Sequence, residues 1–262
     1  MYQQLGLDPD RVVAVVERLE GTAAADRPAL TAVVVGDFSC AQRVRWLLEQ
    51  RGRREVRGLR LFLVERGGLL LLQLPLVIKQ SELADIEKLV SYWEDCFDGF
   101  VTGDLGLLAW LNDRYDSGGA PMRLIYTSNV VNPEVSAWLH ERFDLWRIRP
   151  LMHKRTFIEE PVGHAKDVVV YGNMMLNCST FCVQSGDLPT RCRLSCGEPR
   201  ALTMEGEGER VYLLGRSLIT DRRLDLRPRL DHIADLRSVT LQDLNLGLDE
   251  IARVYQTLAA RP

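Results

Sequence analysis

A repeated alternation between short apolar runs and longer amphipathic stretches constrains the fold of this chain most strongly. Runs rich in leucine or β-branched residues predict strands, and stretches with apolar residues at helical spacing predict helices. Such an alternation is typical of parallel strands joined by helical crossovers. The predicted strands are Ala32–Val35, Leu69–Leu74, Gly99–Thr102, Met122–Tyr126, Leu145–Ile148, Val168–Tyr171 and, with weaker patterns, Val211–Leu214 and Leu236–Val239.

Seven or eight strand-and-helix units in 262 residues match the size of a (β/α)₈ TIM-like barrel, with a doubly wound sheet as the competing fold. We predict one α/β barrel domain over residues 1–262. Met1–Leu7 shows no convincing first strand, and Gly197–Arg210 is a loop rich in glycine and glutamate, so an incomplete or open barrel is also considered. The predicted helices are Asp10–Leu19, Ala41–Gln50, Ser81–Trp93, Leu105–Asn112, Pro133–Arg142 and Leu248–Ala259.

The charge of the chain narrows the classes of partner that it is expected to bind. A net charge of -3 and a pI near 5.9 argue against a wide nucleic-acid surface. Two local basic stretches are interpreted as solvated faces or a partner surface rather than as phosphate sites. They are Arg51, Arg53, Arg54, Arg57 and Arg60, and then Arg222, Arg223, Arg227 and Arg229.

Neither a leader nor a membrane span is expected. Met1–Leu30 lacks a basic start followed by an apolar run, so it does not resemble a secretory signal and a cytoplasmic location is predicted. The longest apolar run, Leu69–Ile78, is interrupted by Gln73 and Pro75 and is about half as long as a bilayer-spanning helix requires. We interpret it as a buried strand.

Four of the six cysteines lie between Asn177 and Cys196, at positions 178, 182, 192 and 196. In a reducing compartment, clustered cysteines indicate metal binding or catalysis more often than disulfides. All four follow the predicted strand that ends at Tyr171, and Cys40 follows the strand Ala32–Val35. Because residues that follow barrel strands gather at one rim, these five thiols are predicted to meet there.

The spacing of the thiols favours an iron–sulfur cluster over zinc. Structural zinc sites use C-x₂-C pairs, which this sequence lacks, whereas C-x₃-C occurs twice, at Cys178–Cys182 and Cys192–Cys196. A cubane cluster is wider than one ion and suits wider spacing. Burial as small apolar residues and a nucleophilic thiol are the alternatives, although no histidine is close in sequence. Cys96 precedes its strand and is predicted to be a packed thiol at the opposite end of the barrel.

Four stretches together resemble the collagenase-like peptidase family, and within it the UbiU and UbiV oxygen-independent hydroxylation proteins, most closely the UbiV branch. The likeness spans Val33–Cys196. It rests on the spacing of the cysteines and on an Asp-Leu-Gly strand end. The stretches are VVVGDFSCAQR, LPLVIKQSELADIEKLV, DGFVTGDLGLL and VVVYGNMMLNCSTFCVQSGDLPTRCRLSC.

The resemblance implies a [4Fe-4S] cluster bound by Cys40, Cys182, Cys192 and Cys196, with the last three on a cysteine-rich loop over residues 172–200. Cys178 has no counterpart in the family pattern, so it is a spare thiol or an alternate ligand. The chain also departs from the family in its N-terminal strand, which looks missing, and in a shorter Cys182–Cys192 loop.

The resemblance further implies a function. It predicts a subunit of an oxygen-independent hydroxylase that acts on an aromatic quinone precursor in ubiquinone biosynthesis, with prephenate as the oxygen source. The implied partner is a UbiU-like homologue in a heterodimer. Relatives hydroxylate RNA bases, and some are described as peptidases, but the acidic pI disfavours nucleic acid as a ligand and the chain has no H-E-x-x-H or G-x-S-x-G motif.

Polar residues near the predicted strand ends are candidates for shaping a substrate cavity at the rim. Arg149 could hold a carboxylate, such as that of the oxygen donor, through paired hydrogen bonds. Buried structural pairing of Asp104 or Arg149 is the alternative. A metal-stabilised, non-catalytic partner of a related hydroxylase stays open as a second function, with a hydrolase third. The five rim candidates are Asp37, Asp104, Asn129, Arg149 and Tyr171.

Overall fold

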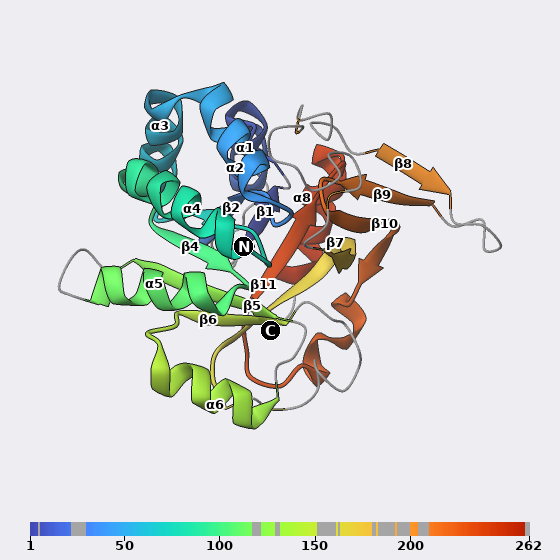
Figure 1. Cartoon of the computed structure of the whole chain (residues 1–262). Coiled ribbons are helices and arrows are strands. Elements are labelled where there is room, and N and C mark those ends of the chain that lie inside the picture. Colours follow the sequence, from blue (N-terminus) through green and yellow to red (C-terminus); the bar gives the residue numbers. More distant parts are fainter. Residues whose placement is uncertain are drawn as a thin grey trace.

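The computed structural model describes residues 1–4, 6–21, 30–116, 122–128, 132–150, 161, 163–179, 182, 192, 200–203 and 210–259. Within these residues, eight parallel strands form a closed barrel (Figure 1). The predicted (β/α)₈ barrel is therefore confirmed. Its strands are β1 (Tyr2–Gln4), β2 (Ala32–Gly36), β3 (Leu69–Gln73), β4 (Gly99–Thr102), β5 (Arg123–Ser128), β6 (Arg147–Pro150), β7 (Lys166–Cys178) and β11 (Leu236–Asp243).

The expectation of an incomplete or open barrel is wrong. Tyr2–Gln4 supplies the first strand, and β11 pairs in parallel with both β1 and β7 and so closes the ring. The strand was missed because it is three residues long and two of them are glutamines. Gln3 faces the barrel interior, where other polar side chains bond it, so the apolar alternation expected of a buried strand is lacking.

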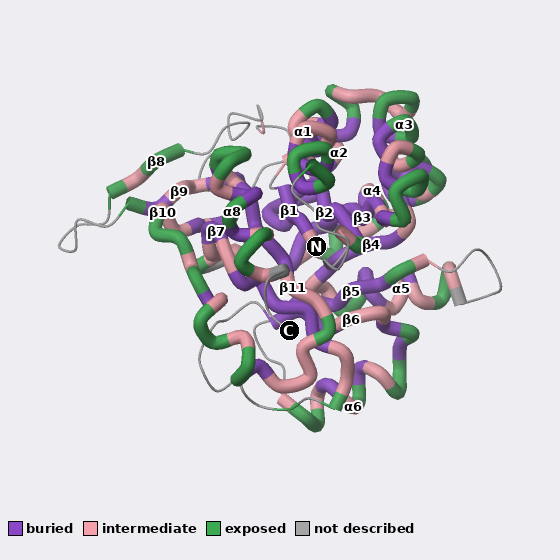
Figure 2. Tube along the Cα trace, turned by 180° about the vertical axis from the view of Figure 1, so that it is seen from behind, coloured by how far each residue is buried: buried purple, intermediate pink, exposed green. Residues whose placement is uncertain are grey.

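Helices cover the outside of the barrel, and their exposed residues lie on the outer faces of α1, α3 and α6 (Figure 2). One helix, α3, was not predicted, and it contains the first basic stretch except Arg51, which ends α2. None of the helices in the described ranges is long and apolar enough to cross a membrane. The helices are α1 (Pro9–Glu20), α2 (Ala41–Arg51), α3 (Arg53–Val64), α4 (Gln80–Trp93), α5 (Leu105–Asp116), α6 (Pro133–Arg142) and α8 (Leu248–Ala259), with the short 3₁₀ helices η1 (Glu94–Cys96) and η3 (Arg227–His232).

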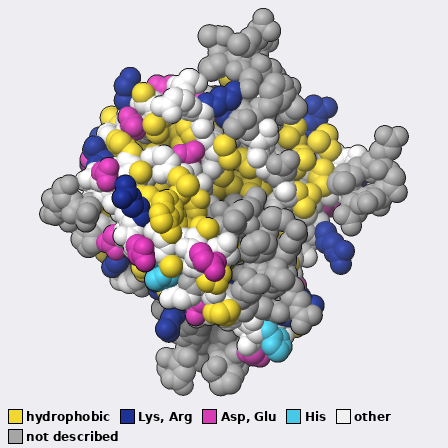
Figure 3. All heavy atoms as spheres, turned by 60° about the horizontal axis from the view of Figure 1, so that its bottom comes forward, with side chains coloured by type: hydrophobic (Ala, Val, Ile, Leu, Met, Phe, Trp, Pro, Cys, Tyr) yellow, Lys and Arg dark blue, Asp and Glu magenta, His cyan; other side chains and the backbone are white. Residues whose placement is uncertain are grey.

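The basic stretches are largely neutralised by carboxylates. On α3, Arg53 and Arg57 pair with Asp95, and Arg60 pairs with Asp98. On the face shown in Figure 3, side chains of both charge signs are interspersed with apolar ones. These pairings fit the interpretation of solvated faces better than that of a phosphate-binding surface.

The strand β7 connects the barrel to an antiparallel extension of the same sheet. Its first half pairs with β6 and β11 inside the barrel, and its second half continues beyond the barrel and pairs in antiparallel fashion with β10 (Ser217–Asp225). β10 in turn pairs with β9 (Arg210–Leu214), which pairs with β8 (Arg200–Thr203). We call β8, β9, β10 and the second half of β7 the arm. Residues Val211–Leu214, predicted as a barrel strand, belong instead to this arm.

The arm packs over the ends of β2 and β3. Its Leu214 and Ile219 form a buried cluster with Phe38 and Leu76, which follow those two strands. Cys178, the last residue of β7, packs against the same cluster. This contact brings the start of the cysteine-rich segment to the loop that precedes Cys40.

Candidate functional site

The loop after β2 is built around the buried carboxylate of Asp37. This carboxylate accepts hydrogen bonds from the Ser39 backbone N–H, at 2.6 Å, and from the Ser39 hydroxyl. It also forms an ion pair with Arg43. Gly36 leaves the strand with a φ of 116°, and a Cβ there would lie 2.7 Å from the Gln73 carbonyl oxygen, so glycine is required. The loop then places Cys40 at the N-cap of α2. A helix N-terminus favours a negatively charged group.

Cys178 lies against this loop. Its Sγ donates to the Phe38 carbonyl oxygen at 3.6 Å. Burial raises the pKa of the Cys178 thiol, and the nearby Asp37 raises it further, while Ser217 and Arg216 lower it. Cys178, the first cysteine of the cysteine-rich segment, therefore lies next to the loop that precedes Cys40, at the rim predicted from the sequence.

Cys182 and Cys192 are the other cysteines of the segment that the structure describes. Cys182 is buried and Cys192 is half-buried, whereas Cys196 lies outside the described residues. Cys96 is fully buried in η1, before β4, with its Sγ 3.9 Å from the Arg53 carbonyl oxygen. That position is at the opposite end of the barrel, as predicted. In the part of the chain that the structure describes, no three His, Cys, Asp or Glu side chains are arranged to hold a metal ion.

A buried ion pair fastens the arm to the rim. Both carboxylate oxygens of Glu82 on α4 accept hydrogen bonds from Arg216, at 2.6 and 3.1 Å. Arg216 lies in the β9–β10 turn, and its carbonyl oxygen accepts the Ser179 backbone N–H at 3.0 Å. In that turn, Gly215 packs so closely on Ser39 that a Cβ would lie 2.4 Å from the Ser39 hydroxyl. The arm is thus held against the Cys40 loop.

Arg149 lies inside the barrel. Its Nε donates to Asp167 at 2.5 Å, its Nη1 to Gln3 at 3.0 Å and its Nη2 to Thr240 at 3.4 Å. Arg149 and Asp167 are buried, so the contacts agree with the structural pairing considered as the alternative. The predicted strand ended at Ile148, but β6 runs to Pro150, so Arg149 lies within the strand and not beyond its end.

The remaining rim candidates have other partners. Asp104 accepts the backbone N–H of Leu107 at 3.0 Å, near the start of α5, and that of Ile78 at 3.2 Å. The Tyr171 hydroxyl donates to Glu250 of α8 at 2.6 Å, so this side chain lies toward the outer helices. β7 continues to Cys178 and Tyr171 does not end the strand. Asn129 lies outside the described residues.

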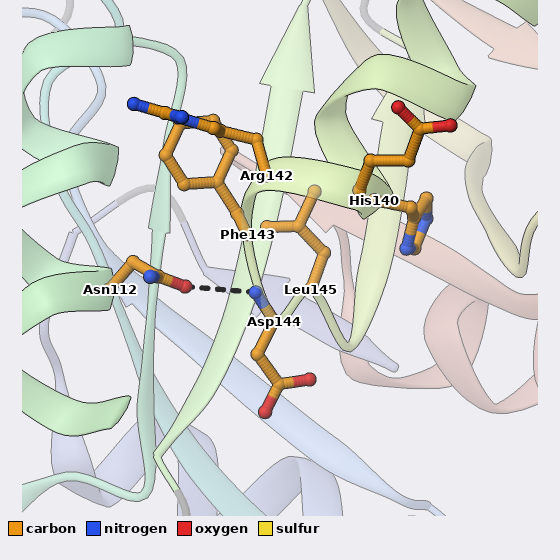
Figure 4. A pocket seen from close by; sticks show the side chains of 7 residues that line it. Asn112, His140, Arg142, Phe143, Asp144 and Leu145 are labelled. Atoms are coloured by element: carbon orange, nitrogen blue, oxygen red, sulfur yellow. Dashed lines mark hydrogen bonds between the residues drawn. The ribbon is translucent and has the colours of Figure 1, made fainter. Parts of the chain in front are cut away.

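A polar cavity lies at the opposite end of the barrel, where α5 and α6 end (Figure 4). The Asn112 side chain accepts the Asp144 backbone N–H at 2.8 Å there. His140 stacks on His164, which precedes β7, with ring centroids 3.6 Å apart. The Nε2 atom of His140 is buried and has no hydrogen-bond partner. The lining residues are Asn112, His140, Glu141, Arg142, Phe143, Asp144 and Leu145.

The histidine pair predicts an acid-sensitive stability. Burial, with the charge of His164, lowers the pKa of His140 from 6.5 to about 4, although Asp144 opposes this. The unfolded chain then binds more protons than the folded one, so stability falls as the pH drops from 6.5 toward 4. In His140→Phe, the free energy of unfolding should fall less between pH 6.5 and pH 4, by about 1–2 kcal/mol. This figure is reduced because the side chain is partly exposed to solvent.

Urea unfolding at about pH 7 and about pH 4.5 measures that effect. His232→Phe is the control, because His232 is exposed in η3 and should leave the pH dependence unchanged. Equal acid sensitivity in the parent and in His140→Phe would contradict the assignment to His140.

No family model matches the chain. No curated protein matches it either. Among solved structures, an uncharacterized B. cereus protein is similar with a TM-score of 0.47 and 8% sequence identity. The match covers 97% of this chain and 63% of that one, so the chain spans less than two-thirds of the length of that structure.

Sequence reasoning missed the polar side chains inside the barrel. Gln3, Gln73 and Thr127 are buried there, and Gln73 bonds Gln3 at 3.3 Å. A signal was present, because Gln73 is the one polar residue in the predicted strand Leu69–Leu74, and its side chain faces inward. A buried polar residue is more informative than a buried apolar one.

Proposed function

We propose that the chain is an iron–sulfur protein and a subunit of an oxygen-independent hydroxylase of an aromatic quinone precursor. The observation that carries the proposal is the contact between Cys178 and the Phe38 carbonyl oxygen, two residues before Cys40. This contact places Cys178 against the loop that leads into Cys40, although the two cysteines are more than a hundred residues apart in the sequence. The closed barrel is the fold that the family resemblance implies.

The donor set fits a [4Fe-4S] cluster in kind, since thiolates are its usual ligands. The residues that would hold it are Cys40, Cys182, Cys192 and Cys196. Such a cluster supplies electron transfer when bound. The chain's own contribution is to fix Cys40 at the start of α2 through Asp37 and Arg43, and to hold the arm beside it through the Arg216–Glu82 ion pair.

A second function is a metal-stabilised partner subunit without catalysis of its own. One observation favours it: Asp37, Asp104, Arg149 and Tyr171, nominated as cavity residues, all have intramolecular partners. In that case the cofactor would hold the arm and the rim together, and a homologous UbiU-like chain would provide the reacting groups. The heterodimer is part of both proposals.

Anaerobic purification tests the iron–sulfur assignment. We expect a brown protein with broad visible absorption and about four irons per chain. Alanine at Cys40, Cys182, Cys192 or Cys196 should each reduce iron content strongly, because every ligand closes part of the site. Cys96→Ala is the matched control, since this buried thiol lies at the other end of the barrel and should leave the iron in place.

Two results would contradict the proposal or alter it. A colourless protein that contains zinc would end the hydroxylase assignment. Loss of iron in Cys178→Ala but not in Cys182→Ala would move the ligand assignment to Cys178. Removal of iron with a chelator separates the two functions: a large fall in Tm points to the structural role, and loss of turnover with the partner chain at unchanged Tm points to the hydroxylase subunit.

A further inference from the structure

The interior of the barrel changes from apolar to polar along its axis. Toward the strand starts, a buried cluster contains Ala32, Val34, Leu71, Val101 and Ile125. Further along the strands most inward positions are polar instead, and Asp167, the second residue of β7, joins them through its bond to Arg149. Barrel interiors are normally filled by bulky branched residues, so this polar region needs a separate explanation. We call it the polar interior, and its buried members are Gln3, Gln73, Thr127, Arg149, Asp167, Thr240 and Gln242.

Some of the hydrogen-bonding groups in the polar interior have no partner. The Thr127 side-chain oxygen is buried and unbonded, and Thr127 lies opposite Arg149 in the β5–β6 register, on the same face of the sheet. A guanidinium has five N–H groups, and Arg149 uses three of them, toward Asp167, Gln3 and Thr240. Among the described residues, two N–H groups and a neighbouring hydroxyl therefore remain for an external acceptor. Leaving such buried groups unbonded is costly.

Arg149 already has a carboxylate partner. Asp167 accepts its Nε at 2.5 Å and also accepts the hydroxyls of Ser238 and Thr240 at 3.0 Å. A carboxylate bound at Arg149 would place a second negative charge close to Asp167 in a region of low dielectric constant. A neutral oxygen acceptor would receive the same hydrogen bonds without that cost.

We infer that Thr127 and Arg149 form a binding site for a small molecule with a neutral carbonyl group, and not for a carboxylate. Thr127 and the free N–H groups of Arg149 donate to the carbonyl oxygen, while Asp167 positions the guanidinium and removes its net charge. As a substrate site this inference rests on the function proposed above, since it names the substrate class of that barrel. It also revises the sequence-based expectation that Arg149 holds a carboxylate.

Isosteric pairs of probes test the inference on the anaerobically purified protein. Acetamide and benzamide carry a neutral carbonyl, and acetate and benzoate are their charged counterparts. Ligand-observed NMR should show the amides binding about tenfold more tightly than the carboxylates. Thr127→Val should weaken amide binding about fivefold, because it removes one donor at nearly constant volume. Ser136→Ala is the matched control, since it removes another buried, unbonded hydroxyl, on α6 outside the barrel.

Asp167→Asn gives the sharper result. It leaves the guanidinium charge unbalanced, so the preference should reverse toward acetate and benzoate. Failure of either amide to bind, tighter binding of the carboxylates by the parent protein, or equal effects of Thr127→Val and Ser136→Ala would each overturn the inference, and ordered water alone would then fill the site. Iron content, measured on the same samples, reports separately on the proposed function. Should Asp167→Asn not fold, the parent and Thr127→Val measurements still decide.

Discussion

Replacing Asp167 with alanine is expected to lower the free energy of unfolding by about 3–5 kcal/mol. The carboxylate is buried in the barrel and is bonded to Arg149, Ser238 and Thr240. Its removal leaves the guanidinium of Arg149 as a buried, unpaired charge, and the cost of that charge exceeds the value of the bond itself. Urea unfolding followed by circular dichroism measures the change.

An exposed ion pair provides the control for this prediction. Asp249 pairs with Arg18 between α8 and α1, and both side chains are more than half exposed to solvent. Asp249→Ala should therefore cost no more than about 1 kcal/mol. The double variant Asp167→Leu with Arg149→Met should recover much of the stability, because it removes both charges. A similar loss for Asp167→Ala and Asp249→Ala would contradict the interior position of the Arg149–Asp167 pair.

Replacing Gly172 with alanine should destabilise the protein by about 3 kcal/mol or more. Gly172 has a φ of 122°, and a Cβ there would lie 1.9 Å from the Gln242 carbonyl oxygen on β11. The residue lies where β7 leaves the barrel and continues into the arm, beside an irregularity in the β7–β11 register. Backbone atoms would have to move, and the seam that closes the barrel would open locally.

Gly67→Ala is the matched variant for this test. Gly67 also has a positive φ, of 72°, but no atom lies within 4 Å of the position that a Cβ would take. Only the intrinsic cost of a left-handed conformation applies, about 1–2 kcal/mol. Thermal unfolding of both variants should therefore show a clearly larger fall in Tm for Gly172→Ala. Equal effects would mean that the close approach of β7 and β11 is absent.

The fold class followed from periodicity, and the details that escaped prediction have local physical causes. The run Gly99–Thr102 and the helix Pro133–Arg142 were predicted to the residue, because turn residues or a capped start mark their ends. The helix Arg53–Val64 was missed because its arginines dominate a pattern whose buried side consists only of Val56, Leu59 and Leu63. The arm was missed because the sequence does not say that β7 changes its partner halfway.

Local patterns also predicted part of the candidate site, and the part that they missed depends on tertiary pairing. The rim position of Cys40 follows directly from the strand before it, and so it could be predicted. Arg149 and Tyr171 were placed at strand ends, whereas both lie inside longer strands. Alternation directs Arg149 inward, and the register irregularity between Val169 and Tyr171 turns Tyr171 toward α8. Strand ends are set by tertiary pairing, here of β6 with β5 and of β7 with β11 and β10, and no local pattern encodes that pairing.

The position of β11 has a consequence for biosynthesis. This strand lies between β1 and β7, yet it is made after every other strand of the ring. A nascent chain can form the curved sheet from β1 to β7 while translation continues, but its two margins stay unsatisfied until residue 243 has left the ribosome. Chains interrupted before that point would expose an unpaired strand edge on each side of the sheet. We expect such chains to bind chaperones and to aggregate.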